Sequence, residues 1–274
     1  MSCDARPALH HMLSWKPRIE EEPLVDDHEN ATHTAKDAVR HRVWTALEQH
    51  GVVEPGVAGR IPAFTGADAA ADRLTSLPAW RSAQRIKANP DRAQLPARIH
   101  ALVSGKTVYM AVPRLTSLHP FYLLDPAVLP VPAAQAASHE AAATYADTVP
   151  VDQVPHLDLV ICGSVAVNPD GVRIGKGAGY ADIELGLLTE VGAITDATAI
   201  VTTVHPLQIL DEPLPETEHD VRVDAIITAE TIIDCPRSRR PRGILWSHLS
   251  DDKIAAIPAL AARAPDAGSG RVNR

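Results

Sequence analysis

The sequence predicts a three-layer α/β fold, in which helices cover both faces of a mostly parallel, Rossmann-like sheet. From about residue 98 onward, short apolar runs recur along the chain, and helical stretches separate some of them. A helical stretch with an apolar side precedes these runs, and such a helix needs a sheet face to cover. We therefore expect one domain, with its ligand site at the carboxyl ends of the strands.

The helices expected before residue 98 are defined by capping residues and by apolar spacing. Thr34 and Asp37 resemble a capping pair, and Gly51 ends the stretch that follows them. The apolar residues of this stretch, which recur at helical spacing, are Val39, Val43, Trp44 and Leu47. A second helical stretch is expected over residues 67–85 with an interruption at Pro78. Its apolar stripe consists of Ala70, Leu74, Leu77 and Trp80.

The expected strands are short apolar runs, several of which read as buried on both faces. They cover residues 99–103, 107–112, 121–124, 157–167, 199–204 and 223–228. A helix is expected at residues 182–191, between two of these strands. The Ala- and Pro-rich segment 128–145, with a short helix at 133–143, is expected to connect strands across the sheet; an inter-domain linker is the alternative.

Composition limits the partners and the compartment of the protein. The 274 residues include 26 Lys and Arg against 34 Asp and Glu, so the net charge is -8. This balance disfavours nucleic acid and an anionic membrane as partners and favours a small-molecule substrate met by a local basic cluster. Cys3, Cys162 and Cys235 lie far apart and show no metal-binding spacing, and no apolar run is long enough to span a membrane. We expect a cytoplasmic protein.

The expected domain boundaries follow hydropathy. Residues 1–30 mix Pro, His and acidic residues without periodicity, and we expect them to be flexible. Residues 31–250 form the α/β domain, and residues 251–274 are expected to form a C-terminal tail of low hydrophobicity at its end.

The strongest functional signal is a glycine-rich loop from Arg173 to Asp182, which follows a strand and a turn and precedes a helix. Three glycines within five residues let backbone N–H groups approach phosphate oxygens, and the positive end of the following helix points to the same place. Arg173 and Lys176 add positive charge. The loop matches no Walker A motif, because no Gly-Lys-Ser/Thr follows. It predicts a nucleoside triphosphate site; a solvated surface turn is the alternative.

These motifs make the chain resemble the 5-formyltetrahydrofolate cyclo-ligase family. The resemblance rests on RIGKGAGYADIE at residues 173–184, EHDVRVDAIIT at 218–228, and the Lys36 to Arg40 spacing. RIPAF at 60–64, VPRL at 112–115, GSVAV at 163–167 and RGILW at 242–246 fit its divergent branch of methenyltetrahydrofolate synthetase domain-containing proteins. The match covers roughly residues 34–246.

The resemblance implies a site for ATP and Mg²⁺. Lys36, Arg173 and Lys176 are the implied catalytic cations. The residues implied to bind ATP are Lys36, Arg40, Arg173, Gly175, Lys176, Gly177, Ala178, Gly179 and Tyr180. Asp182 and Asp220 are the implied Mg²⁺ ligands, which is consistent with the few carboxylates that this ion takes from protein. The alternatives are a solvated helix face for Lys36 and Arg40 and a helix-terminal acid for Asp182.

The implied reaction joins an N-formyl group to a neighbouring ring nitrogen. ATP phosphorylates the formyl oxygen of 5-formyltetrahydrofolate, and loss of phosphate then closes the ring of 5,10-methenyltetrahydrofolate. Positioning and charge stabilisation suffice for this chemistry, so no covalent nucleophile is required. Cys162, in an apolar strand, is expected to be an inert core thiol.

The sequence departs from the family pattern at two places on the substrate side. Ala181 stands where the usual loop has a second tyrosine, and no acidic residue of the folate-binding kind is evident at residues 60–68. Two alternatives to folate cyclisation therefore stay open. One is an ATP-dependent enzyme that activates another amide or carboxylate. The other is a nucleotide-binding protein without turnover.

Two further features read as structural. His205 and His219 are expected to be hydrogen-bonded structural residues. Four arginines that follow the last expected strand are expected to form a solvated connection or to contact acidic residues of the same protein: Arg237, Arg239, Arg240 and Arg242.

Overall fold

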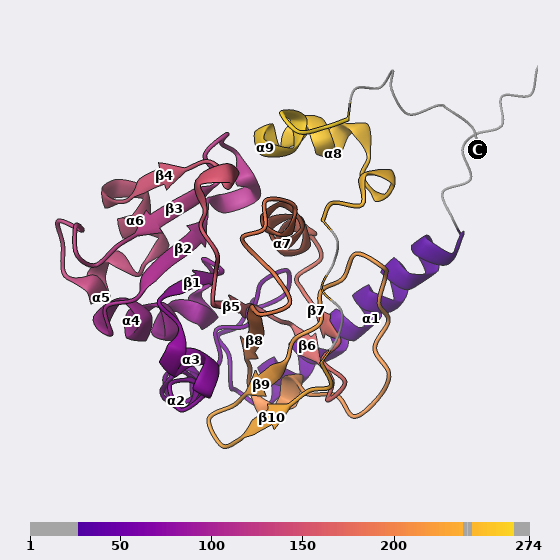
Figure 1. Cartoon of the computed structure of the whole chain (residues 1–274). Coiled ribbons are helices and arrows are strands. Elements are labelled where there is room, and N and C mark those ends of the chain that lie inside the picture. Colours follow the sequence, from indigo (N-terminus) through magenta and orange to yellow (C-terminus); the bar gives the residue numbers. More distant parts are fainter. Residues whose placement is uncertain (1–26, 238–239, 241–242, 266–274) are drawn as a thin grey trace, which may run out of the picture.

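The computed structural model describes residues 27–237, 240 and 243–265 (Figure 1). Most of the N-terminal segment that we expected to be flexible lies outside these residues. The first helix, α1 (Asp27–Gln49), begins earlier than the expected capping pair at Thr34. Its apolar residues Val39, Val43 and Leu47 are buried, as the helical spacing predicts.

The main sheet has eight strands in the order β10-β9-β8-β5-β1-β2-β3-β4. The strands are β1 (Arg85–Ala88), β2 (Thr107–Ala111), β3 (Phe121–Leu124), β4 (Asp147–Val149), β5 (Leu159–Cys162), β8 (Ala199–Thr203), β9 (Ala225–Ile227) and β10 (Ile232–Asp234). A separate antiparallel pair consists of β6 (Ala166–Val167) and β7 (Arg173–Ile174).

The five central strands are parallel, β10 and β3 run antiparallel to the central strands that they adjoin, and the edge strand β4 runs antiparallel to β3. Across the sheet the parallel strands lie in the order β2, β1, β5, β8, β9. The chain therefore builds outward from β1 in one direction to β2, and in the other direction to β5, β8 and β9. This is a doubly wound order that reverses between the first and third strands. The reversal lies between β1 and β5, where Ile86 is paired with Leu159.

Helices cover both faces of the sheet, which confirms the three-layer prediction. One face packs against α1, α2 (Ala67–Leu74), α3 (Pro78–Ser82), α4 (Leu95–Val103), α5 (Ala133–Ala136) and α6 (His139–Tyr145). The other face packs against α7 (Tyr180–Glu190) and α9 (Pro258–Ala261), beside α8 (Asp251–Ala256). Figure 1 shows α7, α8 and α9 on one side of the sheet and α2, α3 and α4 on the other.

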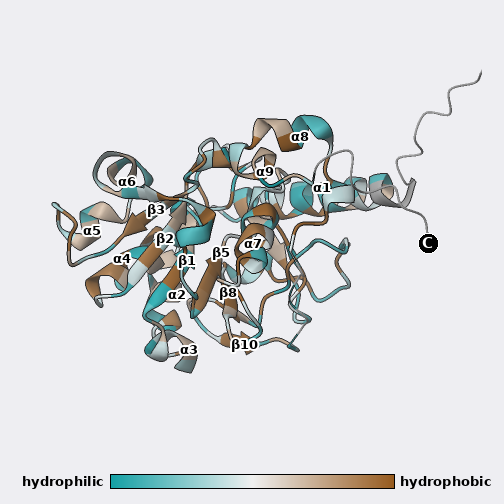
Figure 2. Cartoon of the chain, turned by 45° about the horizontal axis from the view of Figure 1, so that its top comes forward, coloured by the Kyte–Doolittle hydropathy of each residue, from teal (hydrophilic) through white to brown (hydrophobic). Residues whose placement is uncertain are grey.

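Each face of the sheet has its own hydrophobic core, because successive residues of a strand point to opposite faces. Leu159 and Ile161 belong to the core under α2 and α4. Val160 and Cys162 belong to the core under α7. Figure 2 shows strong hydrophobicity along β5, whereas much of α1 and α8 is hydrophilic. No helix within the described ranges has both the length and the apolar character needed to cross a membrane.

Three sequence predictions about elements are wrong or incomplete. Residues 99–103 were expected to form a strand, but they end the helix α4. Pro96 near its start and the buried Ala97, Ala101 and Leu102 give this segment helical rather than strand periodicity. The second helical stretch ends at Ser82, and β1 follows it as a strand that we did not predict.

The C-terminal tail expected from residue 251 is also corrected. Residues 251–261 form α8 and α9, and Ile257 and Leu260 are fully buried in the core under α7. Ile257 lies between the two helices and Leu260 lies in α9. Both helices are too short to show an apolar period in the sequence. Residues 266–274 of the expected tail lie outside the described part of the chain.

Candidate active site

A cavity of about 460 Å³ opens at the point where the strand order reverses. Asn89, which follows β1, and Gly163, which follows β5, both line it. The chain turns from β1 to α4 on one face of the sheet and from β5 to α7 on the other. These diverging connections leave a crevice at the carboxyl ends of the strands, where doubly wound proteins bind ligands. The volume is within the range of about 300–1,000 Å³ for small-molecule sites.

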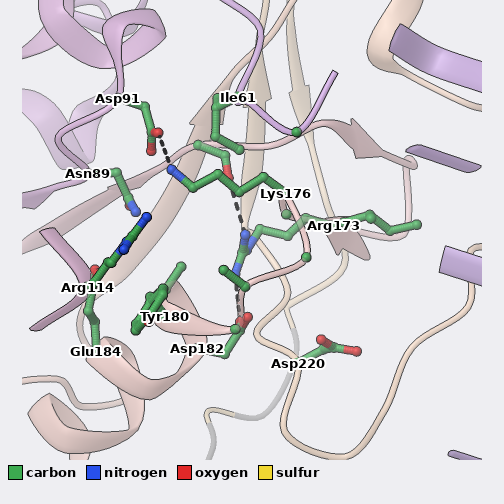
Figure 3. Close-up of a pocket in the computed structure, with 18 of the residues that line it drawn as sticks. Ile61, Asn89, Asp91, Arg114, Arg173, Lys176, Tyr180, Asp182, Glu184 and Asp220 are labelled. Carbon is green, nitrogen blue, oxygen red and sulfur yellow. Dashed lines mark hydrogen bonds and ion pairs between the residues drawn. The ribbon is translucent and has the colours of Figure 1, made fainter. Parts of the chain in front are cut away.

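All the residues that the sequence assigned to ATP or Mg²⁺ line this one cavity. They are Lys36, Arg40, Arg173, Gly175, Lys176, Gly177, Ala178, Gly179, Tyr180, Asp182 and Asp220. They come from α1, from β7 and the loop after it, from the start of α7, and from the loop before β9. Figure 3 shows Arg173, Lys176, Asp182 and Asp220 around the cavity.

The glycine-rich loop presents backbone N–H groups at the start of α7. Gly177 and Gly179 adopt φ angles of 103° and 70°, a region that glycine enters without steric cost. Gly179 is the N-cap of α7. No described residue accepts a hydrogen bond from the N–H groups of residues 176–179. Together with the positive end of the helix, these donors form a binding surface for an anion.

Lys36 of α1 reaches across to the segment that precedes β9. Its Nζ forms an ion pair with Asp220 and lies 3.3 Å from the hydroxyl of Thr217. Burial would raise the pKa of Asp220, but the charge of Lys36 and hydrogen bonds from Thr217 outweigh burial and lower it. The Asp220 carboxylate is therefore ionised, and Lys36 is not a solvated helix residue.

Two arginines bind the ends of the glycine-rich loop, Arg40 at Gly175 and Arg173 at Asp182. Arg40 Nε donates a hydrogen bond of 2.7 Å to the carbonyl of Gly175. Arg173 is buried, and its Nη2 lies 2.6 Å from Oδ1 of Asp182. Burial would lower the pKa of Arg173, but the Asp182 carboxylate raises it above its ordinary value. Asp182 thus pairs with a cation and caps no helix N–H within its own first turn.

Two contacts to the loop were not predicted from the sequence. Lys176 Nζ lies 2.8 Å from Oδ1 of Asp91, which follows β1. Lys253 of α8 donates a hydrogen bond of 2.9 Å to the carbonyl of Ala178, and its Nζ lies 3.8 Å from the ring centre of Tyr180. Such a position over an aromatic face is favourable for a cation. The C-terminal helices therefore hold the loop from outside.

The donor set fits a triphosphate and Mg²⁺ on chemical grounds. Four cationic side chains and the loop N–H groups can meet phosphate oxygens: those of Lys36, Arg40, Arg173 and Lys176. Asp182 and Asp220 are carboxylates of the kind that Mg²⁺ takes from protein. Within the described ranges, no group of three or more His, Cys, Asp or Glu residues is placed to hold a metal ion.

Most of the residues expected to be structural make structural contacts, but His219 lines the cavity, where its Nε2 lies 3.0 Å from the hydroxyl of Thr217. His205 accepts a hydrogen bond from the N–H of Leu207 and caps a short helical turn. Cys162 is fully buried, and burial raises the pKa of its thiol. Arg240 pairs with Asp224, in agreement with the expected contact to an acidic residue. Arg239 and Arg242 lie outside the described residues.

A glycine-rich loop at the start of a helix, placed where a doubly wound sheet reverses, defines an α/β protein with a site for an anionic ligand. A sequence model of the 5-formyltetrahydrofolate cyclo-ligase family matches residues 32–229. The chain belongs to this family. The match includes the loop, α1 and Asp220, and it ends before the C-terminal helices.

Similar proteins carry related names. Mouse methenyltetrahydrofolate synthase domain-containing protein is 38% identical over 231 residues, which cover 82% of this chain and 62% of that protein. Its human counterpart is 34% identical over 237 residues, which cover 84% and 61%. The chain thus spans about three fifths of the length of these relatives. The solved structure of 5,10-methenyltetrahydrofolate synthetase from Aquifex aeolicus is similar at 19% identity, with a TM-score of 0.48 over 74% of this chain and 94% of that one.

Proposed function

We propose that this chain is an ATP- and Mg²⁺-dependent cyclo-ligase that converts 5-formyltetrahydrofolate to 5,10-methenyltetrahydrofolate through a phosphorylated formyl group. The observation that supports the proposal is the convergence of Lys36, Arg173 and the loop N–H groups on a single cavity. Family membership supplies the reaction class.

In this reaction the chain positions two substrates and stabilises charge. The loop N–H groups and Lys36 hold the phosphates, and Arg173 and Lys176 neutralise the charge that develops on the transferred phosphoryl group. Asp182 and Asp220 hold Mg²⁺, which would neutralise phosphate charge when bound. The formyl oxygen takes the γ-phosphoryl group, the neighbouring ring nitrogen attacks the formyl carbon and loses its proton, and phosphate leaves with that oxygen.

A second candidate is a family member that activates a different amide or carboxylate. Ala181 favours it, because it lines the cavity where the usual loop of the family has a tyrosine. An alanine offers neither a ring to stack on a substrate nor a hydroxyl to hydrogen-bond to it. The same phosphate machinery would then serve another acceptor.

The test is phosphate release from MgATP by the purified protein, with and without 5-formyltetrahydrofolate, while methenyltetrahydrofolate is followed by its absorbance. Folate-dependent release that is lost in Lys36→Ala and Asp182→Ala supports the cyclo-ligase. ATP binding without folate-dependent release rejects this substrate, and release with another amide or carboxylate identifies the second candidate.

We also propose a cytoplasmic location. Cys162 and Cys235 are both unpaired. Free thiols are typical of a reducing compartment. Expression of the full chain with a fluorescent tag and cell fractionation tests this location.

A further inference from the structure

A buried ion pair lies beside the phosphate side of the cavity. Lys87 of β1 and Glu184 of α7 bring Nζ and Oε2 to 2.6 Å, and their side chains are 0% and 6% exposed. Lys87 also donates a hydrogen bond of 3.1 Å to Oδ1 of Asn89. Glu184 and Asn89 line the cavity, whereas Lys87 lies behind them.

Glu184 retains capacity to accept a hydrogen bond. Its Oε2 lies against the Lys87 ammonium, and no described residue donates a hydrogen bond to its other oxygen, Oε1. A carboxylate is costly to bury even when it is paired, so its place at the wall of a ligand cavity calls for an explanation.

Asn89 supplies the complementary donor. Its Oδ1 accepts from Lys87, and its side-chain N–H groups donate to no described residue. Figure 3 shows Asn89 and Glu184 on one side of the cavity, with Arg173 and Asp220 on the other. One side of the cavity therefore carries Arg173 and Asp220, and the other offers a carboxylate acceptor and an amide donor beside Arg114.

Stability does not account for the pair. Removing two opposite charges from water costs several kcal/mol per ion, and well-packed apolar side chains often replace a buried pair with no loss of stability. The surroundings of Lys87 are apolar, with Tyr109 and Val160 as its neighbours on adjacent strands. A function for Glu184 in ligand recognition explains why the charges are there.

We infer that Glu184, held by Lys87, and Asn89 form the acceptor-substrate subsite, which recognises the edge of a cyclic amide. In such an edge a ring N–H lies beside a carbonyl oxygen. The N–H donates to Glu184 and the carbonyl accepts from Asn89. This inference rests on the proposed function, because it places the ring of the phosphorylated acceptor beside the loop.

The experiment compares two variants with the wild-type protein. Glu184→Gln keeps the shape and removes the charge. The double variant Lys87→Met with Glu184→Leu replaces the pair by apolar side chains. Binding of 5-formyltetrahydrofolate, of pterin and of pteridine, which lacks the amide edge, is measured by calorimetry in the presence of a non-hydrolysable ATP analogue. ATP affinity and the thermal unfolding midpoint are measured for each protein.

We expect Glu184→Gln to weaken binding of 5-formyltetrahydrofolate and pterin about 10- to 100-fold, the loss typical of a hydrogen bond to a charged group. ATP affinity stays within about twofold of the wild type, because Glu184 is not part of the loop. The double variant should also bind 5-formyltetrahydrofolate and pterin more weakly, and its thermal unfolding midpoint should equal or exceed that of the wild type. A pair that is only structural would change stability and leave pterin binding unchanged.

The outcomes separate this inference from the proposed function. Pterin binding that depends on Glu184, without folate-dependent phosphate release, supports the subsite and rejects the cyclo-ligase. Folate turnover with unchanged binding in Glu184→Gln supports the cyclo-ligase and overturns the subsite. Wild-type protein that binds neither pterin nor 5-formyltetrahydrofolate, or that binds pteridine as well as pterin, also overturns it.

Discussion

Lys36 and Asp220 form a buried ion pair although 184 positions separate them in the chain. Arg173 and Asp182 form a second pair in the same cavity. Each pair joins a cation proposed to bind phosphate to a carboxylate proposed to bind Mg²⁺. Under the proposed function, nucleotide binding would therefore be an exchange of partners, in which phosphate takes the cations and Mg²⁺ takes the carboxylates.

This exchange predicts that ATP and Mg²⁺ strengthen each other's binding. In Asp220→Asn, Lys36 no longer has a competing carboxylate, so ATP alone should bind more tightly than it does to the wild type. The gain in ATP affinity on adding Mg²⁺ should fall about tenfold, because one Mg²⁺ ligand is lost. Calorimetric titration with and without Mg²⁺ measures both effects. Glu212→Gln, in an exposed pair with Arg42, is the control and should show neither.

Loss of the Lys36 charge should weaken MgATP binding about 10- to 100-fold, as expected for a hydrogen bond to a charged group. Lys36→Met and Arg42→Met provide a matched comparison on the same helix, because Arg42 is exposed and pairs with Glu212 outside the cavity. Titration of MgATP into each variant gives the affinity, and circular dichroism checks the fold. Equal affinities for the two variants would contradict the assignment of Lys36.

The lowered pKa of Asp220 predicts a loss of stability in acid. Its carboxylate is favoured in the folded protein, so its contribution is complete above the unfolded pKa of about 3.9 and is lost as pH falls through the lower folded value. The difference in unfolding midpoint between wild type and Asp220→Asn should stay constant above about pH 5 and shrink below about pH 4. Thermal unfolding across this range measures it. An undiminished difference near pH 3 would show that Lys36 does not stabilise this carboxylate.

Alanine substitutions of Gly179 and Gly192, which lie at the two ends of α7, form a matched pair that tests the role of the loop. They have φ angles of 70° and 75°, and a Cβ at either position would meet nothing within 4 Å. Alanine should cost about 1–2 kcal/mol of unfolding free energy at each, since left-handed backbone is strained for other residues. Only Gly179→Ala should also weaken MgATP binding. Denaturant unfolding and nucleotide titration of both variants separate strain from function.

Lys253 should contribute to nucleotide binding although it does not line the cavity. Lys253→Met removes the hydrogen bond to Ala178 and the charge over Tyr180, so the loop should be held less firmly. We expect ATP affinity to fall about three- to tenfold, as for the loss of one hydrogen bond. Arg263→Met is the control, because its exposed pair with Asp152 lies in the same C-terminal segment away from the loop. Equal affinities would limit the segment to packing.

The fold was predictable where a strand is an uninterrupted apolar run. The strands at residues 107–111, 121–124 and 199–203 were predicted within one residue of their ends. The central strand β1 was missed, because its sequence Arg-Ile-Lys-Ala carries a charge at a fully buried position. That residue is Lys87. The prediction therefore failed at a residue that we assign to the substrate side, as is expected where function overrides local patterning.

The phosphate side of the site was predictable because its glycines and cations are contiguous or lie one helical turn apart. The glycine-rich loop and the Lys36 to Arg40 spacing are both local signals. Glu184 and Lys253 were not singled out from the sequence. Glu184 ends the quoted motif but lies among buried apolar residues of α7, and Lys253 lies in a short helix that meets the loop only in three dimensions. Contacts between distant segments leave no spacing to detect.

Completion of the site is a late event in the synthesis of this protein. The strands and the glycine-rich loop are all made by residue 234, but the residue that holds Ala178 is Lys253, anchored through Ile257 and Leu260. A ribosome-bound chain that has exposed the whole sheet still lacks that contact. We therefore expect the nascent protein to acquire its full affinity for nucleotide only after α8 and α9 have left the exit tunnel and docked, so that ligand binding reports the docking of these two helices.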